Sequence, residues 1–370
     1  MANNPLLELR KLGQSVWLDD LGRAMLADGS LAHLIADDGL GGVTSNPSIF
    51  AASMMKEPQY AAAVRERLAA VSSSQALYES LAIEDVQAAA DLFSKLYRDT
   101  SRGDGFVSLE VSPHIAYDSA ASITEGKRLW GQLQRPNVMI KIPGTEPGLT
   151  AIRELIGAGI NVNVTLLFSP ARYRAVAEAF LDGLESRLAA GNAIDHIASV
   201  ASFFLSRIDT LVDKRLDELA ARGQPAARAL RGKAALASAS RAYALYTEMM
   251  ASGRWEKLAA LGARPQRLLW ASTSAKDPAY SPVKYVEELV AAETVNTMPR
   301  QTLEAYRRLG QPEARLERHM ADAADALESF ERLDVDLDAV AETLEDEGVR
   351  KFVEPFDQLQ AWLEEKRKNR

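Results

Sequence analysis

The sequence contains no cysteine and only four histidines. The first absence excludes disulfides, thiolate nucleophiles and cysteine metal sites. The histidines do not pair with one another or with a carboxylate at the short spacing of a helix-borne zinc site; they are His33, His114, His196 and His319. Because metal sites in proteins that lack cysteine usually need several histidines, metal-dependent chemistry is disfavoured. We expect no metal and no cofactor.

Several sequence signatures of common classes are also missing. We find no G-x-S-x-G turn for a serine nucleophile and no glycine-rich loop for a dinucleotide or a nucleoside triphosphate. No apolar run is long enough to cross a bilayer, and the N-terminus has no basic stretch leading into one. We therefore expect a cytoplasmic protein without a membrane partner, and the lack of cysteine fits a reducing compartment.

Positive charge is in short supply as well. Lysine and arginine number 43 against 51 aspartates and glutamates, which gives a net charge of -8. A nucleic-acid partner would require a basic face, so the sequence argues against one. Any anionic ligand must then be bound by a local pocket.

Eight short β-rich segments alternate with stretches whose apolar residues have helical spacing. The segments are 15–19, 41–45, 106–111, 137–142, 160–168, 197–205, 267–272 and 293–298. Alternation of strand and helix predicts a parallel sheet, and eight such units predict a (β/α)8 TIM barrel. A doubly wound open sheet is the alternative.

Two regions exceed a minimal barrel. Residues 48–104 add helices between the second and third strands, and residues 299–370 add helices after the last strand. We expect a single domain over residues 1–370, with residues 300–370 as a C-terminal helical extension packed on the barrel. The simplest interpretation is that these helices bury apolar stripes against it. The alternative is a role in forming a homodimer or in covering the site.

The stretch NVMIKIPGT, residues 137–145, contains a lysine in a segment that otherwise has the pattern of a buried strand. Lys141 could protect a sheet edge or extend its amine to water, although a closed barrel has no edge. In a partly apolar pocket, desolvation disfavours the ammonium, and the neutral amine can attack a ketone or aldehyde carbonyl. The iminium ion that results stabilises the carbanion left by carbon–carbon cleavage.

Further polar residues lie near the predicted C-terminal ends of the strands, where the loops of a barrel converge on one face. They are Asp19, Asn46, Glu110, Asn163, Thr165, Ser202 and Ser272. Each one alone has a structural interpretation, such as a helix cap for Asp19, a turn with Pro47 for Asn46, or a partner for a buried backbone group. Buried parallel strands are normally almost wholly apolar, so the whole set predicts a shared site.

An iminium mechanism assigns roles to these residues. Glu110 and Thr165 flank Lys141 on neighbouring strands and could hold a water that carries the proton during imine formation. Asp19 is the free carboxylate best placed to act as base on the substrate hydroxyl. Asn46 and Asn163 offer amide groups that can orient sugar hydroxyls.

Many sugars that undergo such chemistry carry a phosphate, and three residues could bind it. Arg207 follows the sixth strand and can make a bidentate contact with phosphate oxygens. Ser272 ends the seventh strand, and Lys276 lies in the loop after it. Alternatively, Arg207 pairs with Asp209 or Asp213 on the surface.

Five stretches of the chain resemble the transaldolase family, in order and nearly throughout residues 1–299. They are GGVTSNPSIF (41–50), VSLEVSPHIAYD (107–118), VMIKIPGTEPGLTAI (138–152), INVNVTLLFS (160–169) and VASFFLSRIDTLVD (200–213). The resemblance implies a metal-free aldolase barrel of the pentose phosphate pathway. Such enzymes move a dihydroxyacetone unit from sedoheptulose 7-phosphate to glyceraldehyde 3-phosphate, which gives erythrose 4-phosphate and fructose 6-phosphate.

Carried over position by position, the resemblance makes Lys141 the Schiff-base lysine, Asp19 the acid and base, and Glu110 with Thr165 the pair that holds water. It implies substrate contacts at Asn46, Asn163, Ser202, Phe204, Arg207 and Ser272. One departure is the loop after the seventh strand, where shorter members carry an arginine and this chain has Lys276 to supply the charge.

Two competing functions follow from the same residues. A simple aldolase acting on fructose 6-phosphate would keep the iminium lysine and release free dihydroxyacetone. A catalytically inactive barrel that serves as a scaffold would have to keep the whole polar set by accident.

Overall fold

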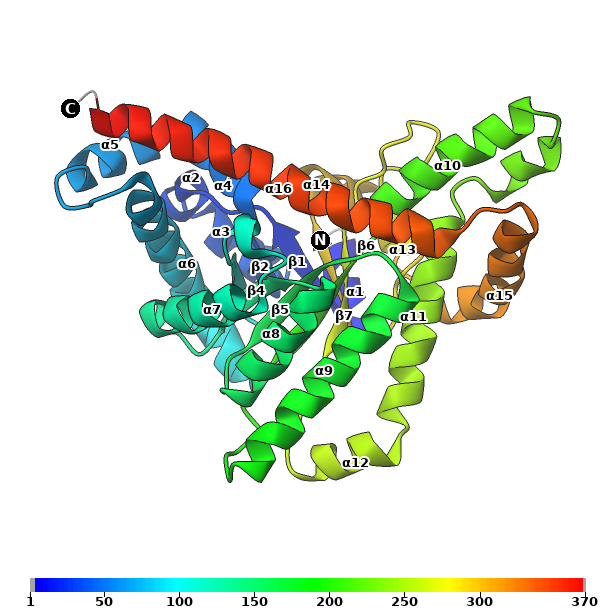
Figure 1. Cartoon of the computed structure of the whole chain (residues 1–370), viewed down its shortest axis with the longest axis horizontal. Helices are drawn as coiled ribbons and strands as arrows, with labels where there is room; N and C mark the ends of the chain where they lie inside the picture. The colour runs from blue at the N-terminus through cyan, green and yellow to red at the C-terminus, as the bar shows by residue number, and fades with distance from the viewer. Residues whose placement is uncertain (1–3, 369–370) are drawn as a thin grey trace.

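The computed structural model describes residues 4–368 and contains a closed barrel of parallel strands (Figure 1). Each strand pairs with the next in chain order, and the last pairs with the first. The strands are β1 (Gln14–Asp19), β2 (Gly42–Thr44), β3 (Phe106–Glu110), β4 (Val138–Pro143), β5 (Val162–Leu167), β6 (Ser199–Phe204), β7 (Arg267–Ala271) and β8 (Thr294–Met298). The predicted (β/α)8 barrel is confirmed, and the open doubly wound sheet is wrong.

The fifth strand shows how far sequence patterns fix the ends of a strand. The apolar pattern predicts residues 160–168, whereas β5 spans Val162–Leu167. Asn161 precedes it, and its side-chain amide donates to the Pro136 and Val138 carbonyls and accepts from the Ala198 amide. A buried side chain thus supplies hydrogen bonds at the place where the sheet begins.

Helices surround the barrel, one before β1 and the others after the strands. They are α1 (Pro5–Lys11), α2 (Arg23–Ala27), α3 (Ser30–Asp37), α7 (Ser119–Leu133), α8 (Glu146–Gly157), α9 (Pro170–Ala189), α10 (Ser206–Ala221), α11 (Ala234–Met250), α12 (Gly253–Ala260), α13 (Lys284–Glu287) and α14 (Arg300–Leu309), with short 3-10 helices η1 (Pro113–Ile115) and η2 (Pro225–Leu230). Thr145 and Ser169 cap α8 and α9 just after β4 and β5. Such caps start the helix immediately, which keeps the loops at the barrel mouth short.

The insertion between β2 and β3 consists of α4 (Pro47–Lys56), α5 (Pro58–Arg67) and α6 (Ser74–Asp99). Asn46 caps α4 by accepting from the Ile49 amide at 3.0 Å. The extra helices predicted here are present. None of the helices in residues 4–368 is both long and apolar enough to span a membrane.

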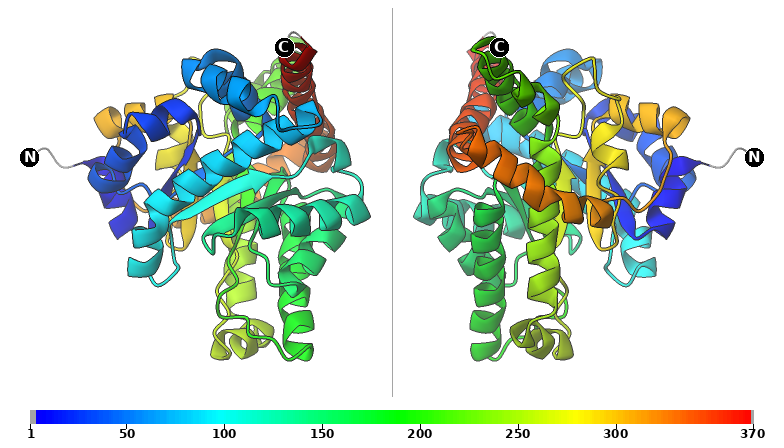
Figure 2. Two further views of the ribbon diagram at one scale, coloured as in Figure 1. Left: turned by 90° about the vertical axis from the view of Figure 1, so that its left-hand side faces the viewer. Right: turned by 90° about the vertical axis from the view of Figure 1, so that its right-hand side faces the viewer.

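After β8 and α14 come two further helices, α15 (Leu316–Arg332) and α16 (Leu337–Lys368). The red helix α16 runs along the upper side of the molecule from the end of α15 to the C-terminus (Figures 1 and 2). It contacts α4, α6, α10, η1 and strand β5, so it crosses several loops at the C-terminal end of the barrel. Leu344, Gly348, Phe352 and Phe356 lie on one buried stripe of this helix at four-residue spacing.

A group of charged and polar side chains fills the opposite, N-terminal end of the barrel. We call Ser15, Trp17, Asp104 and Arg267 the basal cluster. The Asp104 carboxylate accepts from Ser15 Oγ at 2.5 Å and from Trp17 Nε1 at 3.0 Å. Arg267 Nη2 lies 3.3 Å from Asp104 Oδ1, and its Nη1 donates to Ser15 Oγ at 3.0 Å. Every charged group of this cluster therefore has a partner.

Gly42 allows two neighbouring strands of the barrel to pack closely. A Cβ at Gly42 on β2 would lie 2.6 Å from Trp17 Cε2 and 2.7 Å from the Phe106 carbonyl oxygen. No side chain fits there, because the indole of β1 occupies the space next to the backbone of β2.

Candidate active site

Lys141 is placed inside the barrel by β4. Its side chain is buried, with 4% exposure, and Nζ donates to the Ser45 carbonyl at 3.1 Å and lies 3.1 Å from Glu110 Oε2. In the sheet register Lys141 is opposite Glu110 on β3 and Asn163 on β5. The closed barrel and the burial rule out a lysine that protects an edge or reaches water.

Glu110 is a buried carboxyl group with few partners. Burial raises its pKa, while the nearby Lys141 charge opposes the shift. Apart from the ion pair with Lys141, neither carboxylate oxygen has a hydrogen-bond partner among the described residues. The same is true of the buried Thr165 Oγ1 on β5. Unpartnered buried polar atoms are costly, so these atoms are suited to a water or a substrate group.

Asp19 ends β1 and forms a second carboxyl group of the site. Its Oδ1 accepts from Thr44 Oγ1 at 2.6 Å, and Thr44 Oγ1 lies 2.8 Å from Thr297 Oγ1. Burial raises the pKa of Asp19, and the charges of Lys141 and Arg207 oppose the shift. Both acids of the site are therefore biased toward proton uptake, which suits groups that exchange protons with a substrate.

A buried hydrogen-bond chain links three strands beneath the lysine. Ser202 Oγ on β6 donates to Asn163 Oδ1 at 2.7 Å, and Asn163 Nδ2 donates to Ser108 Oγ on β3 at 3.0 Å. This chain fixes the orientation of the Asn163 amide. Asn46 uses its carbonyl oxygen for the α4 cap, so its amide nitrogen is the group left for a ligand.

Arg207 follows β6 and does not form the surface pairs considered from the sequence. Asp209 accepts from Lys284 and Tyr285, and Asp213 accepts from Tyr280. The predicted alternative of an ion pair between Arg207 and either aspartate is therefore wrong.

The guanidinium of Arg207 instead lies over the Phe204 ring, with 5.4 Å between Cζ and the ring centroid. Its buried Nη1 has no hydrogen-bond partner in residues 4–368, and burial lowers the pKa of Arg207. Phe204 is itself held by Phe168, with 5.4 Å between the two ring centroids. A cation that is fixed in place and lacks a partner is prepared for an anion.

Ser272 and Lys276 follow β7, beside the start of α10, where Arg207 lies. Ser272 Oγ is 2.9 Å from Ser206 Oγ, the residue next to Arg207. Partial desolvation lowers the pKa of Lys276, and the positive charge of Arg207 lowers it further. Lys276 Nζ donates to Ser274 Oγ at 2.7 Å. Two cations that repel each other, together with the hydroxyls of Ser206 and Ser272, are groups that can bind an anion.

The backbone is strained at two strand ends of this site. Leu166 has a φ of 62° and Ser272 a φ of 53°, both in the left-handed region that non-glycine residues avoid. Leu166 lies where the register between β5 and β6 shifts, directly after Thr165. Such irregularities redirect side chains next to functional sites, and here they follow the hydroxyl beside Lys141.

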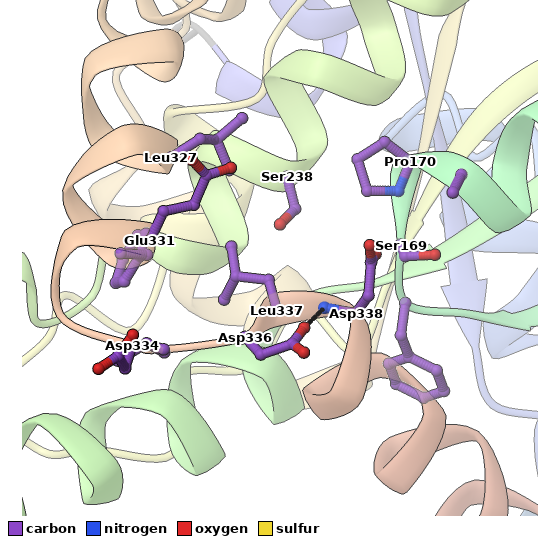
Figure 3. Close-up of a pocket in the computed structure, with 13 residues that line it drawn as sticks. Ser169, Pro170, Ser238, Leu327, Glu331, Asp334, Asp336, Leu337 and Asp338 are labelled. Atoms are coloured by element: carbon purple, nitrogen blue, oxygen red, sulfur yellow. Dashed lines mark hydrogen bonds between the residues drawn. The ribbon is translucent and has the colours of Figure 1, made fainter.

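A cavity of about 510 Å³ lies outside this cluster, between the start of α9, α11 and the segment joining α15 to α16 (Figure 3). Its rim is acidic, with Glu331, Asp334, Asp336 and Asp338. None of the predicted site residues lines it. The converging charges at the barrel mouth, rather than this acidic hollow, fit an anionic sugar.

Sequence reasoning missed several groups that complete the site. Four of them are Thr44, Ser45, Ser108 and Ser206, which contact predicted residues. The first three are polar residues on a buried strand or directly after one, as the predicted residues are. Phe352 on α16 is the fifth, with its ring centroid 5.6 Å from Lys141 Nζ. No strand pattern points to it, because it comes from the C-terminal extension.

Comparison with known proteins agrees with this geometry. Residues 16–363 match the family model described as "Transaldolase/Fructose-6-phosphate aldolase". The chain belongs to this family. Among its relatives is a "Transaldolase" of Thiobacillus denitrificans, 47% identical over 356 residues, which are 96% of this chain and 98% of the relative.

Two more relatives show that the likeness extends over the C-terminal helices. A "Transaldolase" of Thermobifida fusca is 48% identical over 357 residues, which are 96% of each chain. A "Transaldolase 2" of a Nostoc species is 44% identical over 374 aligned positions, covering 99% of this chain and 98% of the relative. The resemblance to the family is thus confirmed, and the chain is an enzyme of the transaldolase type rather than an inactive scaffold.

Proposed function

We propose that this enzyme transfers a dihydroxyacetone unit from sedoheptulose 7-phosphate to glyceraldehyde 3-phosphate through a Schiff base on Lys141. The products are erythrose 4-phosphate and fructose 6-phosphate, as in the pentose phosphate pathway. The observation that carries the proposal is the buried Lys141 Nζ, 3.1 Å from Glu110 Oε2, next to unpartnered carboxylate and hydroxyl oxygens.

Imine formation requires a neutral amine and the removal of water. Glu110 is positioned to accept a proton from Lys141, because burial already raises the pKa of this carboxyl group. The amine then attacks the keto carbon of the sugar, and the carbinolamine loses its hydroxyl as water after protonation. A water held between Glu110 and Thr165 would deliver that proton.

Cleavage of the carbon–carbon bond needs a base on the hydroxyl next to it. Asp19 serves this role, with Thr44 fixing its orientation at 2.6 Å. The electron pair of the broken bond moves into the iminium and forms an enamine, and the aldehyde fragment leaves. Addition of the acceptor aldehyde reverses these steps, with Asp19 returning the proton.

The phosphate end of the sugar would bind to Arg207, Lys276 and Ser272. Arg207 has a buried nitrogen without a partner among the described residues, and desolvation, together with the charge of Arg207, lowers the pKa of Lys276. A phosphate would accept a hydrogen bond from the Arg207 nitrogen and would stabilise the positive charge of Lys276. Asn46, Asn163, Ser202 and Phe204 would orient the carbon chain between phosphate and lysine.

The experiment is reduction with borohydride in the presence of fructose 6-phosphate, followed by mass spectrometry of the peptides. We expect a reduced three-carbon or six-carbon adduct on Lys141 and none when Lys141 is replaced by methionine. An unmodified Lys141 in an active enzyme would refute the Schiff base.

A second candidate is an aldolase that releases dihydroxyacetone from fructose 6-phosphate, since the matching family model also names that activity. Supplying fructose 6-phosphate alone, and then with erythrose 4-phosphate, separates the two. A transferase forms a seven-carbon sugar phosphate with the acceptor and turns over little without it. Equal turnover under both conditions would favour the aldolase.

Several expectations from the sequence stay predictions. These are a homodimer, a cytoplasmic location, the lack of a nucleic-acid partner, and a single domain over residues 1–370 with residues 300–370 as its packed extension. Sedimentation velocity would test the first. Limited proteolysis would test the last, since a separately folded extension would be released intact.

A further inference from the structure

Helix α16 packs closely on the barrel mouth at Gly348. A Cβ at this position would lie 2.9 Å from Leu166 Cδ2 and 3.6 Å from Arg207 Nη1. A larger residue would therefore crowd the Leu166 side chain on β5 and contact the guanidinium. The residue that brings α16 down onto the site is a glycine without a side chain, packed on the strained Leu166.

One turn later, the same face of α16 presents Phe352 to the lysine. The ring is 4% exposed, and its centroid is 5.6 Å from Lys141 Nζ. Ser48 on α4 donates to the Lys351 carbonyl at 3.3 Å, which ties this turn of the helix to the first turn of α4. An aromatic face at this distance attracts a cation and excludes water from one side of it.

The next turn anchors the helix away from the lysine. The Phe356 ring meets Tyr78 edge-on at 5.4 Å between centroids and His114 at 5.9 Å. The His114 Nε2 atom is 2.7 Å from Asp357 Oδ1, and Tyr117 donates to Asp346 at 2.6 Å. These contacts hold α16 at both sides of Phe352, so that its ring has a fixed position above the site.

We propose that Phe352 shields the covalent adduct on Lys141 from water and thereby favours transfer of the three-carbon unit over its release. This inference rests on the proposed function, because it requires the enamine on Lys141. Phe352 takes no part in proton transfer. It acts by covering the nitrogen and the carbon bonded to it.

The enamine has two fates that divide at its nucleophilic carbon. In transfer, this carbon forms a bond to the acceptor aldehyde carbon, and the aldehyde oxygen takes up a proton from Asp19. In release, the carbon takes up a proton from water instead. Each fate leaves an iminium, and in both of them water adds to the iminium carbon and the carbon–nitrogen bond breaks, which frees the amine and either the seven-carbon sugar phosphate or dihydroxyacetone. A ring that keeps water from the enamine therefore slows the protonation that commits it to release.

The test is the ratio of dihydroxyacetone released to seven-carbon product formed, with fructose 6-phosphate and erythrose 4-phosphate as substrates. Phe352→Ala is expected to raise this ratio about 10-fold or more, because water gains access to the adduct. Phe352→Leu keeps an apolar side chain and folds more readily, and it should raise the ratio by a smaller factor. An unchanged ratio in both variants would overturn the inference.

The matched control is Phe356→Ala, one turn along the same face. It removes a buried aromatic side chain that contacts Tyr78 and His114, so it should lower thermal stability and leave the ratio unchanged. A rise in the ratio equal to that of Phe352→Ala would show that loosening of α16 is responsible and would overturn the role of Phe352.

Borohydride trapping separates this inference from the function beneath it. If the Phe352 variants give a trapped adduct on Lys141 and an unchanged ratio, the proposed function is supported and the shielding role of Phe352 is refuted. If the unaltered enzyme gives no trapped adduct, both the Schiff base and the shielding role are refuted. A trapped adduct with a raised ratio supports both.

Discussion

The two ends of the barrel each bury charged side chains, but they satisfy them differently. In the basal cluster, Asp104 and Arg267 have partners for their charges, and Ser15 and Trp17 donate to the same carboxylate. At the mouth, Glu110 and Arg207 keep buried atoms without a hydrogen-bond partner among the described residues. Buried charge alone therefore does not mark a reactive site. Buried charge with unfilled hydrogen-bonding capacity does.

The sharpest way to break this comparison is to replace Lys141 by methionine. We expect a loss of at least about 10⁴-fold in kcat, because no other amine can form the imine. Thermal stability should change little, since Glu110 can take up a proton and become neutral once its partner is gone. Activity assays and thermal unfolding on the same sample test both halves. Residual activity within 10²-fold would contradict the assignment.

The opposite result is expected at the base of the barrel. Asp104→Ala leaves the Arg267 guanidinium without its carboxylate, and Ser15 and Trp17 lose an acceptor. Breaking a buried ion pair costs about 3–5 kcal/mol of unfolding free energy. Denaturant unfolding should show this loss, while kcat per folded molecule stays close to that of the unaltered enzyme. A change in kcat without a change in stability would mean that the basal cluster serves catalysis and not stability.

The two ends of the barrel can also be compared through one residue type, because Arg207 lies at the mouth and Arg267 at the base. Arg207→Ala should raise KM for fructose 6-phosphate about 10- to 100-fold, since a hydrogen bond to a charged group contributes about 1.5–3 kcal/mol. Activity on unphosphorylated fructose should be unaffected. Arg267→Ala should lower stability and leave KM unchanged. Equal loss with the phosphorylated and the unphosphorylated sugar would mean that Arg207 does not bind phosphate.

The smallest expected effect is on pH dependence. Burial raises the pKa of both Glu110 and Asp19 in the folded enzyme. Their contribution to stability is thus complete below the ordinary carboxyl value of about 4 and is lost as the pH rises through the raised values.

Activity should rise with pH where this contribution to stability falls, because Glu110 and Asp19 act as bases in their ionised form. It should fall as the pH drops through the raised values, which places the acidic limb of kcat/KM above pH of about 4. Glu110→Gln removes one of the two ionisations and should shift the limb, as a pH series would show. An acidic limb at the ordinary carboxyl value would contradict the raised values.

Much of the fold could be read from the sequence because each βα unit has its own local signal. Apolar β-rich segments predict all eight strands, and their order predicts a closed barrel. The ends of the strands were harder to predict. The side-chain hydrogen bonds of Asn161 and the positive φ of Leu166 alter the sheet locally, and the spacing of apolar residues carries no information on either.

The site was predictable where the chemistry lies on strands, and less so elsewhere. A lysine or a carboxylate in a buried strand conflicts with the apolar pattern around it, which is why Lys141 and Glu110 attract attention. Phe352 does not conflict with its surroundings, because a phenylalanine on the apolar stripe of a helix is ordinary. Its meaning comes from a contact with a residue far away in the chain, and that contact depends on the whole fold.

The position of α16 has a consequence for the order in which the enzyme is made. Strand β8 ends at Met298, so the sheet can close before the segment Leu337–Lys368 leaves the ribosome. The lysine would then lie in an open barrel until α16 emerges and places an aromatic ring above it. Covering of the reactive nitrogen would thus follow closure of the sheet during synthesis.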